Sequence, residues 1–358
     1  MNILSLLAVI ALCASITNCS SELASSDAAP ATQTPAGQPN VQEAVSRQCL
    51  TEQVKNCTAS NPCSNGRETF NSPSDQPACT QDGGALSFTD AQGTSRYYCQ
   101  YKPSTSSLKP LVIWLHGGSG SADNVYSFTT MRNRAVSSGF ILVSLQSRNL
   151  QVNLARLNDG HHFDSWWWDV KAPSTNPDID ALDRLIDIQV RNNQADPQKI
   201  YLMGWSEGGM LAQLYGMARH ETPSTYGHKV AAIVAFSASS PFHRKYENNR
   251  DCTPDILLKS QLPIFTMSRS CDVVACNKQQ ETDLWNRGSF ADPINMEDWK
   301  SVLQSTINNA NVTHVLLNKD NSVASACAVT CTLQEATNNH LAWPVSYEGT
   351  MLNFLFSH

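Results

Sequence analysis

The sequence predicts an α/β fold built on an open, mostly parallel β-sheet with helices on both faces. Six short apolar runs occur along the chain, and they are continuous rather than alternating, as expected of strands buried on both faces. Segments with helical spacing lie between them, and this βαβα order is typical of a parallel sheet. A length of 358 residues with 41% hydrophobic composition is enough for one large domain with a sizeable core.

The N-terminus has the pattern of an export signal. An apolar stretch of about 14 residues from Ile3 to Ile16 is too short to span a bilayer and has the length of a signal-peptide core. We therefore interpret residues 1–19 as a signal peptide and expect no transmembrane span. Cys19 follows a weak lipobox pattern, so a lipid anchor at Cys19 and ordinary cleavage both remain open. We expect the protein to be secreted or attached to the cell envelope.

Two polar segments precede the predicted sheet. Residues 20–45 are rich in Ser, Ala and Pro, which indicates a flexible linker. Residues 46–87 are Cys-rich and contain many turn-forming residues, which indicates a disulfide-stapled lead-in. The α/β domain is then expected over residues 88–358.

The cysteines favour an oxidising compartment. Two of the twelve, Cys13 and Cys19, lie in the predicted export signal, and the even number that remains allows up to five disulfides. The chain has no CxxC pair and no His at ligand spacing from a Cys pair, so we predict no metal site. The remaining cysteines are Cys49, Cys57, Cys63, Cys79, Cys99, Cys252, Cys271, Cys276, Cys327 and Cys331.

The strands and helices of the sheet domain follow from the position of apolar residues. One apolar stripe with helical spacing runs from Ile179 to Ile186 and another from Trp299 to Ile307, so both segments are predicted helices. The predicted strands cover residues 110–118, 139–147, 199–204, 230–239, 262–268 and 314–319.

A serine between two glycines is the candidate nucleophile. Ser206 follows one predicted strand and precedes a helical run. On such a tight strand-to-helix turn, side chains two positions on either side would collide, so Gly204 and Gly208 are required sterically. This context favours a catalytic Ser206 over an ordinary small residue in a Gly-rich loop.

The acid and the base of a serine nucleophile of this type follow it along the chain in that order. Asp272 lies just past the end of a predicted strand, and His340 lies in a predicted loop after the last strand. We predict that these two residues complete a catalytic triad. A turn-forming Asp and a surface-loop His are the alternatives. His314 lies inside a strand and His358 is terminal, so both are poorer candidates for the base.

A serine nucleophile also needs hydrogen-bond donors for the oxyanion that it creates. An HGG turn ends the first long strand, at the place where hydrolases of this kind supply one backbone N–H. We predict that Gly118 N–H and Glu207 N–H form the oxyanion hole. A phosphate-binding loop is the alternative, but no Gly-Lys-Ser/Thr follows. The Glu207 carboxylate is expected to disfavour anionic acyl groups.

Four tryptophans are candidate substrate-binding residues. Trp166, Trp167 and Trp168 are consecutive, and neighbouring side chains diverge on a strand or helix, so at least one is expected to line a cleft. A core position is the alternative for each of them. Trp205, next to the candidate nucleophile, is the fourth.

The acid loop contains two cysteines. Cys271 adjoins Asp272, and Cys276 lies five positions after Cys271. We expect a bridge from Cys271, either to Cys276 or to a distant partner, to hold the acid toward the base, because a triad tolerates little displacement. General stabilisation of the fold is the alternative.

Several segments together resemble a known family. They are "SRYYCQYKPS", "PLVIWLHGG", "SWWWDV", "DPQKIYLMGWSEGG", "CDVV" and "HLAWP". The chain resembles the secreted esterases of the α/β-hydrolase superfamily that include poly(3-hydroxybutyrate) depolymerases and feruloyl or acetylxylan esterases. The resemblance covers most of residues 88–358. It implies an α/β-hydrolase fold, a triad of Ser206, Asp272 and His340, and a polyester or an esterified polysaccharide as substrate.

The sequence therefore predicts an exported serine ester hydrolase that uses no metal or organic cofactor. The formal net charge of −6 comes without a long basic run, so nucleic acid is not an expected partner. A serine peptidase of related fold and a non-catalytic cell-surface binding protein are the two alternatives.

Overall fold

The structure is a computed structural model. The predicted signal peptide, the predicted linker and Trp166, Trp167 and Trp168 lie outside the described residues, as do Cys49, Cys57, Cys63 and Cys252. The residues that the structure describes are 68–69, 75–104, 106–152, 160–163, 165, 176–241, 259–276, 296–308, 311–328 and 330–358.

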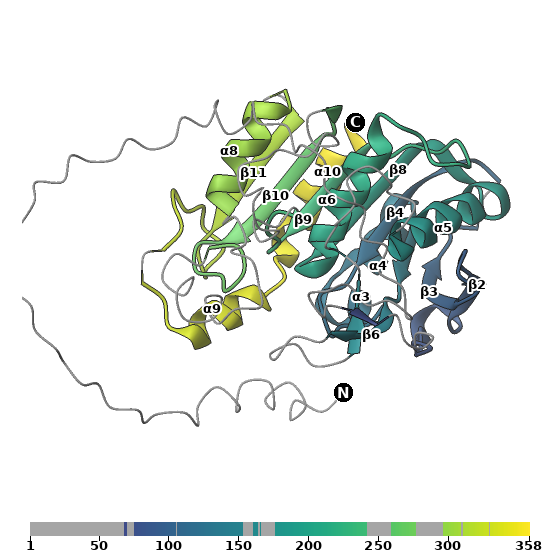
Figure 1. Ribbon diagram of the computed structural model, residues 1–358, viewed down its shortest axis with the longest axis horizontal. Coiled ribbons are helices and arrows are strands. Elements are labelled where there is room, and N and C mark those ends of the chain that lie inside the picture. The colour runs from purple at the N-terminus through teal and green to yellow at the C-terminus, as the bar shows by residue number, and fades with distance from the viewer. Residues whose placement is uncertain are drawn as a thin grey trace, which may run out of the picture. The chain divides into compact units, whose positions relative to one another are not determined.

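The described residues form an eight-stranded sheet in the order β11-β10-β9-β8-β4-β5-β3-β2 (Figure 1). The pairs from β5 through β4 to β11 are parallel, whereas β3 pairs antiparallel with both β5 and β2. The prediction of a mostly parallel sheet is therefore confirmed. The strands are β2 (Leu86–Thr89), β3 (Ser95–Tyr101), β4 (Lys109–Leu115), β5 (Ile141–Leu145), β8 (Ala195–Trp205), β9 (Ala232–Phe236), β10 (Ile264–Arg269) and β11 (Val312–Leu317).

Strands β2 and β3 were not among the predicted strands. The side chains of β2 are mostly exposed, so this edge strand has no continuous apolar run for the sequence to reveal. Because β2 begins at Leu86, the sheet starts two residues before the predicted domain boundary. Strand β4 ends at Leu115, three residues earlier than expected, because the HGG turn already departs from the sheet.

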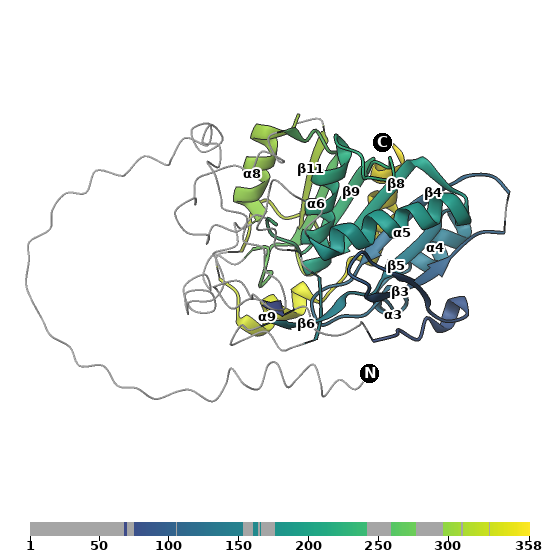
Figure 2. The ribbon, with the colours of Figure 1, turned by 45° about the vertical axis from the view of Figure 1, so that its right-hand side comes forward.

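Helices cover both faces of the sheet, as predicted. Helices α5, α6 and α8 pack on one face with Leu111, Ile113 and Leu115 of β4. Helices α3, α4 and α10 pack on the other face with Val112 and Trp114. Figure 2 shows α5 and α6 lying across the strands on one side. The helices are α3 (Asn124–Phe128), α4 (Met131–Ser138), α5 (Pro177–Asn193), α6 (Glu207–His220), α8 (Met296–Thr306), α9 (Leu333–His340) and α10 (Glu348–Phe356).

A small antiparallel sheet lies beside the HGG turn. It consists of β1 (Glu68–Thr69), β6 (Arg148–Val152) and β7 (Gly160–His162) in the order β1-β6-β7. Ser119 N–H, directly after the turn, donates to His161 O at 2.7 Å. Strand β7 is thereby fixed to the turn. Among the described helices, none combines the length and apolar composition that crossing a bilayer requires.

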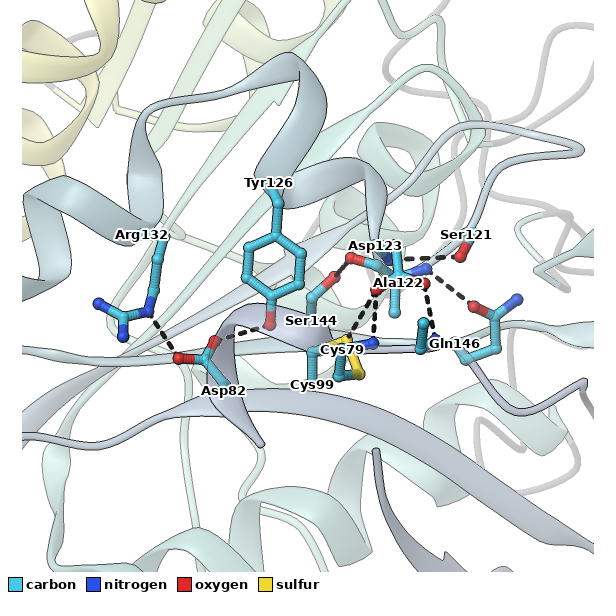
Figure 3. Close-up of a disulfide and its surroundings, with 11 residues drawn as sticks. Cys79, Asp82, Cys99, Ser121, Ala122, Asp123, Tyr126, Arg132, Ser144 and Gln146 are labelled. Atoms are coloured by element: carbon cyan, nitrogen blue, oxygen red, sulfur yellow. Dashed lines mark hydrogen bonds and ion pairs between the residues drawn. A yellow bond between two sulfur atoms is a disulfide. The ribbon is translucent and has the colours of Figure 1, made fainter. Parts of the chain in front are cut away.

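A disulfide between Cys79 and Cys99 joins the Cys-rich lead-in to β3 (Figure 3). Asp123, just before α3, accepts a hydrogen bond from Cys79 N–H at 2.7 Å. Asp82 accepts one from Tyr126 Oη–H at 2.6 Å. These contacts attach the last part of the lead-in to the sheet domain rather than leaving it as a separate module.

Removing the Cys79–Cys99 bridge should lower the free energy of unfolding. The bridge joins residues 20 positions apart, and a loop of this size is expected to contribute about 3 kcal/mol by restricting the unfolded chain. Guanidinium unfolding of the Cys79→Ser, Cys99→Ser double variant, followed by circular dichroism without reductant, measures this loss. An unchanged unfolding midpoint would contradict the prediction.

Candidate active site

Ser206 occupies a strained turn between β8 and α6. Its backbone has φ 55° and ψ −121°, a region that residues other than glycine rarely adopt. A Cβ on Gly204 would lie 2.1 Å from Gly208 O, and a Cβ on Gly208 would lie 2.3 Å from Leu115 O. Both glycines are therefore required by close backbone approach, which agrees with the steric argument from the sequence.

The structure brings the three predicted triad residues together in one hydrogen-bonded chain. Ser206 Oγ–H donates to His340 Nε2 at 2.8 Å, and His340 Nδ1–H donates to Asp272 Oδ1 at 3.0 Å. Asp272 is 1% exposed, whereas the side chain of His340 retains contact with solvent. This geometry allows His340 to take a proton from the serine while Asp272 fixes the orientation of the imidazole.

The Asp272 carboxylate has a partner for each of its oxygens. Oδ1 accepts hydrogen bonds from Val274 N–H at 2.7 Å and Ala275 N–H at 2.9 Å, and Oδ2 accepts one from Ser237 Oγ–H at 2.6 Å. Burial by itself raises the pKa of Asp272, but His340, Ser237 and Ala275 together outweigh it and hold the pKa below its ordinary value. The carboxylate is therefore ionised at neutral pH.

His340 lies at the end of a helix and not in the loop that the sequence predicted. It is the last residue of α9, a short polar helix without an apolar stripe long enough to indicate a helix. Thr332 and Glu335 form a capping box at its start, and this Thr-x-x-Glu pattern was the sequence signal that could have revealed it.

Trp205, the fourth candidate for a substrate contact, is largely buried beside the predicted base. It is only 5% exposed, and its ring packs against Phe128 at a centroid distance of 5.2 Å. Its indole Nε1–H donates to His340 O at 2.9 Å. The residue before the nucleophile thus holds the backbone of the predicted base, and a substrate contact at Trp205 stays a prediction.

Arg269, which the sequence analysis did not single out, holds the segment after His340. Its Nε and Nη2 donate to Ala342 O at 3.1 and 3.0 Å, and its Nη1 donates to Asn318 O at 2.9 Å. Burial lowers the pKa of Arg269, and the nearby Asp272 charge opposes that shift. The guanidinium ties the end of β10, where the acid loop begins, to the chain that follows the base.

Two disulfides join the acid loop to the segment that leads into α9. Cys271 is bonded to Cys331, and Cys276 is bonded to Cys327. The expected bridge from Cys271 is therefore formed with a distant partner and not with Cys276. Asp272 lies between two covalent links to the segment whose helix ends in His340.

The HGG turn lies against the nucleophile. A Cβ on Gly117 would be 3.3 Å from Ser206 Cβ. His116 Nδ1–H donates to Gly117 O at 2.7 Å, and Ser147 N–H donates to His116 Nε2 at 3.2 Å. Burial lowers the pKa of His116 to about 3, so this imidazole is neutral and fixes the turn by hydrogen bonds alone.

Among the described residues, no group accepts a hydrogen bond from Gly118 N–H or from Glu207 N–H, the first amide of α6. Both amides belong to segments that adjoin Ser206. A helix N-terminus next to the nucleophile also favours negative charge there.

The Glu207 side chain contacts a histidine that the sequence analysis missed. Its Oε2 lies 3.2 Å from His162 Nδ1 and accepts a hydrogen bond from Phe163 N–H, also at 3.2 Å. Glu207 is 7% exposed and His162 2% exposed. No sequence motif connects these two positions. They come together because β7, which ends at His162, lies beside the start of α6. The expected effect of Glu207 on anionic acyl groups remains a prediction.

The described residues offer one cluster of metal-ligand type, formed by Cys79, Cys99 and Asp123. Its two cysteines are joined in a disulfide, so neither can act as a thiolate ligand. The cluster therefore does not suit a metal ion.

The sheet order, the strained serine turn and the hydrogen-bonded Ser–His–Asp set are those of the α/β-hydrolase fold. A family model described as BD-FAE matches residues 99–262. Feruloyl esterase B of Neurospora crassa is 27% identical over 160 residues, which are 43% of this chain and 47% of that protein. The chain thus spans about half the length of the curated relative that it matches. These matches confirm the resemblance to an esterase-like α/β-hydrolase family.

Solved structures of esterases are similar as well. An esterase from Thermogutta terrifontis is 12% identical with a TM-score of 0.46, and the match covers 77% of this chain and 96% of that one. An acetyl xylan esterase from Paenibacillus sp. R4 is 11% identical with a TM-score of 0.45, and the match covers 76% and 83% of the two chains.

Replacing Ser237 by alanine should raise the pKa of Asp272, because the carboxylate loses a donor while burial remains. A carboxylate with a lowered pKa stabilises the fold above its unfolded pKa, and this contribution is lost as the pH falls through the folded pKa. In Ser237→Ala the loss should therefore be smaller and should be complete at a higher pH, and the variant should be about 1–2 kcal/mol less stable near pH 7.

Chemical unfolding at a series of pH values measures this effect. Ser239→Ala is the matched control, since Ser239 is also fully buried but its hydroxyl contacts the sulfur of Met210 and not a carboxylate. A Ser237→Ala variant whose stability depends on pH as the wild type does would contradict the role of this hydroxyl.

Removing the Cys271–Cys331 bridge should reduce kcat more than the loss of stability explains. The bridge begins next to Asp272, and displacement of a catalytic group by about 1 Å can lower the rate on the order of a hundredfold. We expect at least about a tenfold loss of kcat in the Cys271→Ser, Cys331→Ser variant. The measurement is kcat on any ester that the wild type hydrolyses, together with the melting temperature.

The Cys79→Ser, Cys99→Ser variant is the control for this experiment, because its bridge lies outside the acid loop. Equal losses of kcat in the two variants at equal melting temperatures would show that the Cys271–Cys331 bridge acts only on general stability.

Proposed function

We propose that the protein is an exported serine hydrolase of carboxylic esters. The single observation that carries this proposal is the hydrogen-bonded chain from buried Asp272 through His340 to Ser206 on a strained turn. The similarity to feruloyl esterase B supports an ester rather than a peptide as the substrate.

In the first half of the proposed reaction, Ser206 Oγ attacks the carbonyl carbon of the ester. His340 Nε2, 2.8 Å from that oxygen, accepts the hydroxyl proton, and the ionised Asp272 stabilises the resulting imidazolium. Gly118 N–H and Glu207 N–H donate to the oxyanion of the tetrahedral intermediate. His340 then gives its proton to the alcohol oxygen as the C–O bond breaks, and an acyl-enzyme remains.

In the second half of the proposed reaction, a water molecule hydrolyses the acyl-enzyme. His340 takes a proton from the water as the water oxygen attacks the acyl carbon. The second tetrahedral intermediate uses the same two amides, and its collapse returns the proton from His340 to Ser206 Oγ and releases the acid. This chemistry needs only groups that the chain itself supplies.

We further propose that the substrate is a feruloyl or acetyl ester of a polysaccharide, with a polyester as the second candidate. The feruloyl group is supported by the name of the matched relative, feruloyl esterase B. A polymeric substrate outside the cell fits the proposed export. Three disulfides among the described residues support an oxidising compartment.

A panel of chromogenic esters tests the function, with feruloyl, acetyl-sugar and fatty acyl members, a peptide amide for comparison and polyester clearing plates. Ser206→Ala and His340→Ala should each lower kcat by about four to six orders of magnitude, because the triad acts as a unit. Ser206→Ala should also abolish labelling by a fluorophosphonate.

His314→Gln is the matched control. His314 is a largely buried histidine that contacts Thr266 Oγ1 at 2.9 Å, and burial lowers its pKa to about 4. This variant should keep most of the activity. Loss of activity in His314→Gln together with retention in His340→Ala would show that the base is wrongly assigned, and cleavage of the peptide amide alone would indicate a peptidase.

A further inference from the structure

Strand β7 and the residue that follows it connect the two segments that carry the proposed oxyanion donors. On one side, Ser119 N–H donates to His161 O at 2.7 Å, and His161 Nδ1 lies 2.9 Å from Gly120 O. On the other side, Phe163 N–H donates to the Glu207 carboxylate at the start of α6. The HGG turn and the nucleophile helix are thus both attached to one short strand.

The Glu207–His162 contact lies at the centre of this connection. Both residues are almost completely buried, and the carboxylate lies 3.2 and 3.3 Å from His162 Nδ1 through its two oxygens. A buried carboxylate needs hydrogen-bond donors, and here an imidazole N–H and Phe163 N–H supply them. The pair therefore holds the first turn of α6 against β7.

The HGG turn rests directly on this pair. A Cβ on Gly118 would lie 3.2 Å from His162 Nδ1 and 3.3 Å from Glu207 Oε2. The Cα of Gly118 therefore faces the contact between the two side chains. A change in the position of either side chain would be transmitted to the amide of Gly118, because the turn has little space to move independently.

We propose that Glu207 and His162 form a positioning pair that sets the distance between Gly118 N–H and Glu207 N–H. The inference rests on the proposed function, in which these two amides bind the oxyanion. Oxyanion donors stabilise the transition state only when they are held at hydrogen-bond distance from the developing charge. The side chain of Glu207 thus has a role separate from that of its own amide.

Substitution can separate the two roles, because every variant of Glu207 except proline keeps the backbone N–H. Glu207→Ala removes the carboxylate, whereas Glu207→Gln keeps an acceptor for Phe163 N–H and a similar volume. His162→Ala removes the imidazole, whereas His162→Asn keeps an N–H donor near the place of Nδ1. Rescue by the two conservative variants would identify hydrogen bonding as the cause of any loss.

Steady-state kinetics on the best ester of the panel tests the proposal. Glu207→Ala and His162→Ala should each lower kcat by about ten- to a hundredfold, with KM within about threefold, because removal of a whole donor costs on the order of a hundred- to a thousandfold. Glu207→Gln should recover most of kcat. The Glu207→Ala, His162→Ala double variant should be no slower than the worse single variant, since both act through one contact.

The chain offers a matched control pair in Asp187 and His228. His228 Nε2 lies 3.2 Å from Asp187 Oδ1, and both side chains are largely buried. Asp187 is on α5 and His228 follows α6 at the end opposite to Ser206. Asp187→Ala and His228→Ala should change the melting temperature. They should not show the loss of kcat that is expected of Glu207→Ala and His162→Ala.

A second measurement does not depend on turnover. The ¹⁵N–¹H signal of Gly118 should shift in Glu207→Ala and in His162→Ala but not in the two control variants. An unchanged Gly118 signal, or kcat within about twofold of the wild type in both alanine variants, would overturn the proposal. Failure of the proposed function looks different: the wild type would then hydrolyse no ester faster than Ser206→Ala does, whereas an unchanged Gly118 signal would overturn the positioning pair alone.

Discussion

The buried carboxylate of Asp272 is the constraint on which the rest of the site depends. An ionised group removed from water is stable only when hydrogen bonds replace its hydration. Ser237, the acid loop itself and His340 supply these partners from three different parts of the chain. The acid loop and α9 must therefore lie close together. The two disulfides link these segments covalently, and Arg269 holds them together by hydrogen bonds.

The parallel sheet explains why such distant segments can meet. Strands β8, β9 and β10 are neighbours, and the functional residues follow the carboxyl ends of these strands one after another. Ser206 follows β8, Ser237 follows β9 and Asp272 comes shortly after β10. A continuous core on both faces holds the three strand ends at fixed distances. The geometry of the site is therefore a property of the sheet more than of any single loop.

The sequence predicts the features that residues close together in the chain determine, and it does not reveal contacts between distant residues. The buried strands were predictable because each is continuously apolar, and Ser206 was predictable because its turn requires glycines nearby in the chain. The helix that ends at His340 was not expected, since α9 is too polar to show an apolar stripe. Ser237, Arg269 and His162 were missed because their partners lie 35 or more positions away along the chain and no motif connects them.

Backbone strain at the site follows from the same arrangement. Ser206 and Ser237 both have positive φ, 55° and 50°, and each comes directly after its strand. Both are held by the next strand, since Ser206 N–H donates to Phe236 O and Ser237 N–H donates to Met267 O, each at 2.8 Å. Such conformations cost about 1–3 kcal/mol each and persist only when the surrounding structure fixes them. In these strained conformations the Ser206 hydroxyl donates to His340 and the Ser237 hydroxyl donates to Asp272. The hydrogen bonds of the sheet that hold the two strained residues therefore also keep the triad aligned.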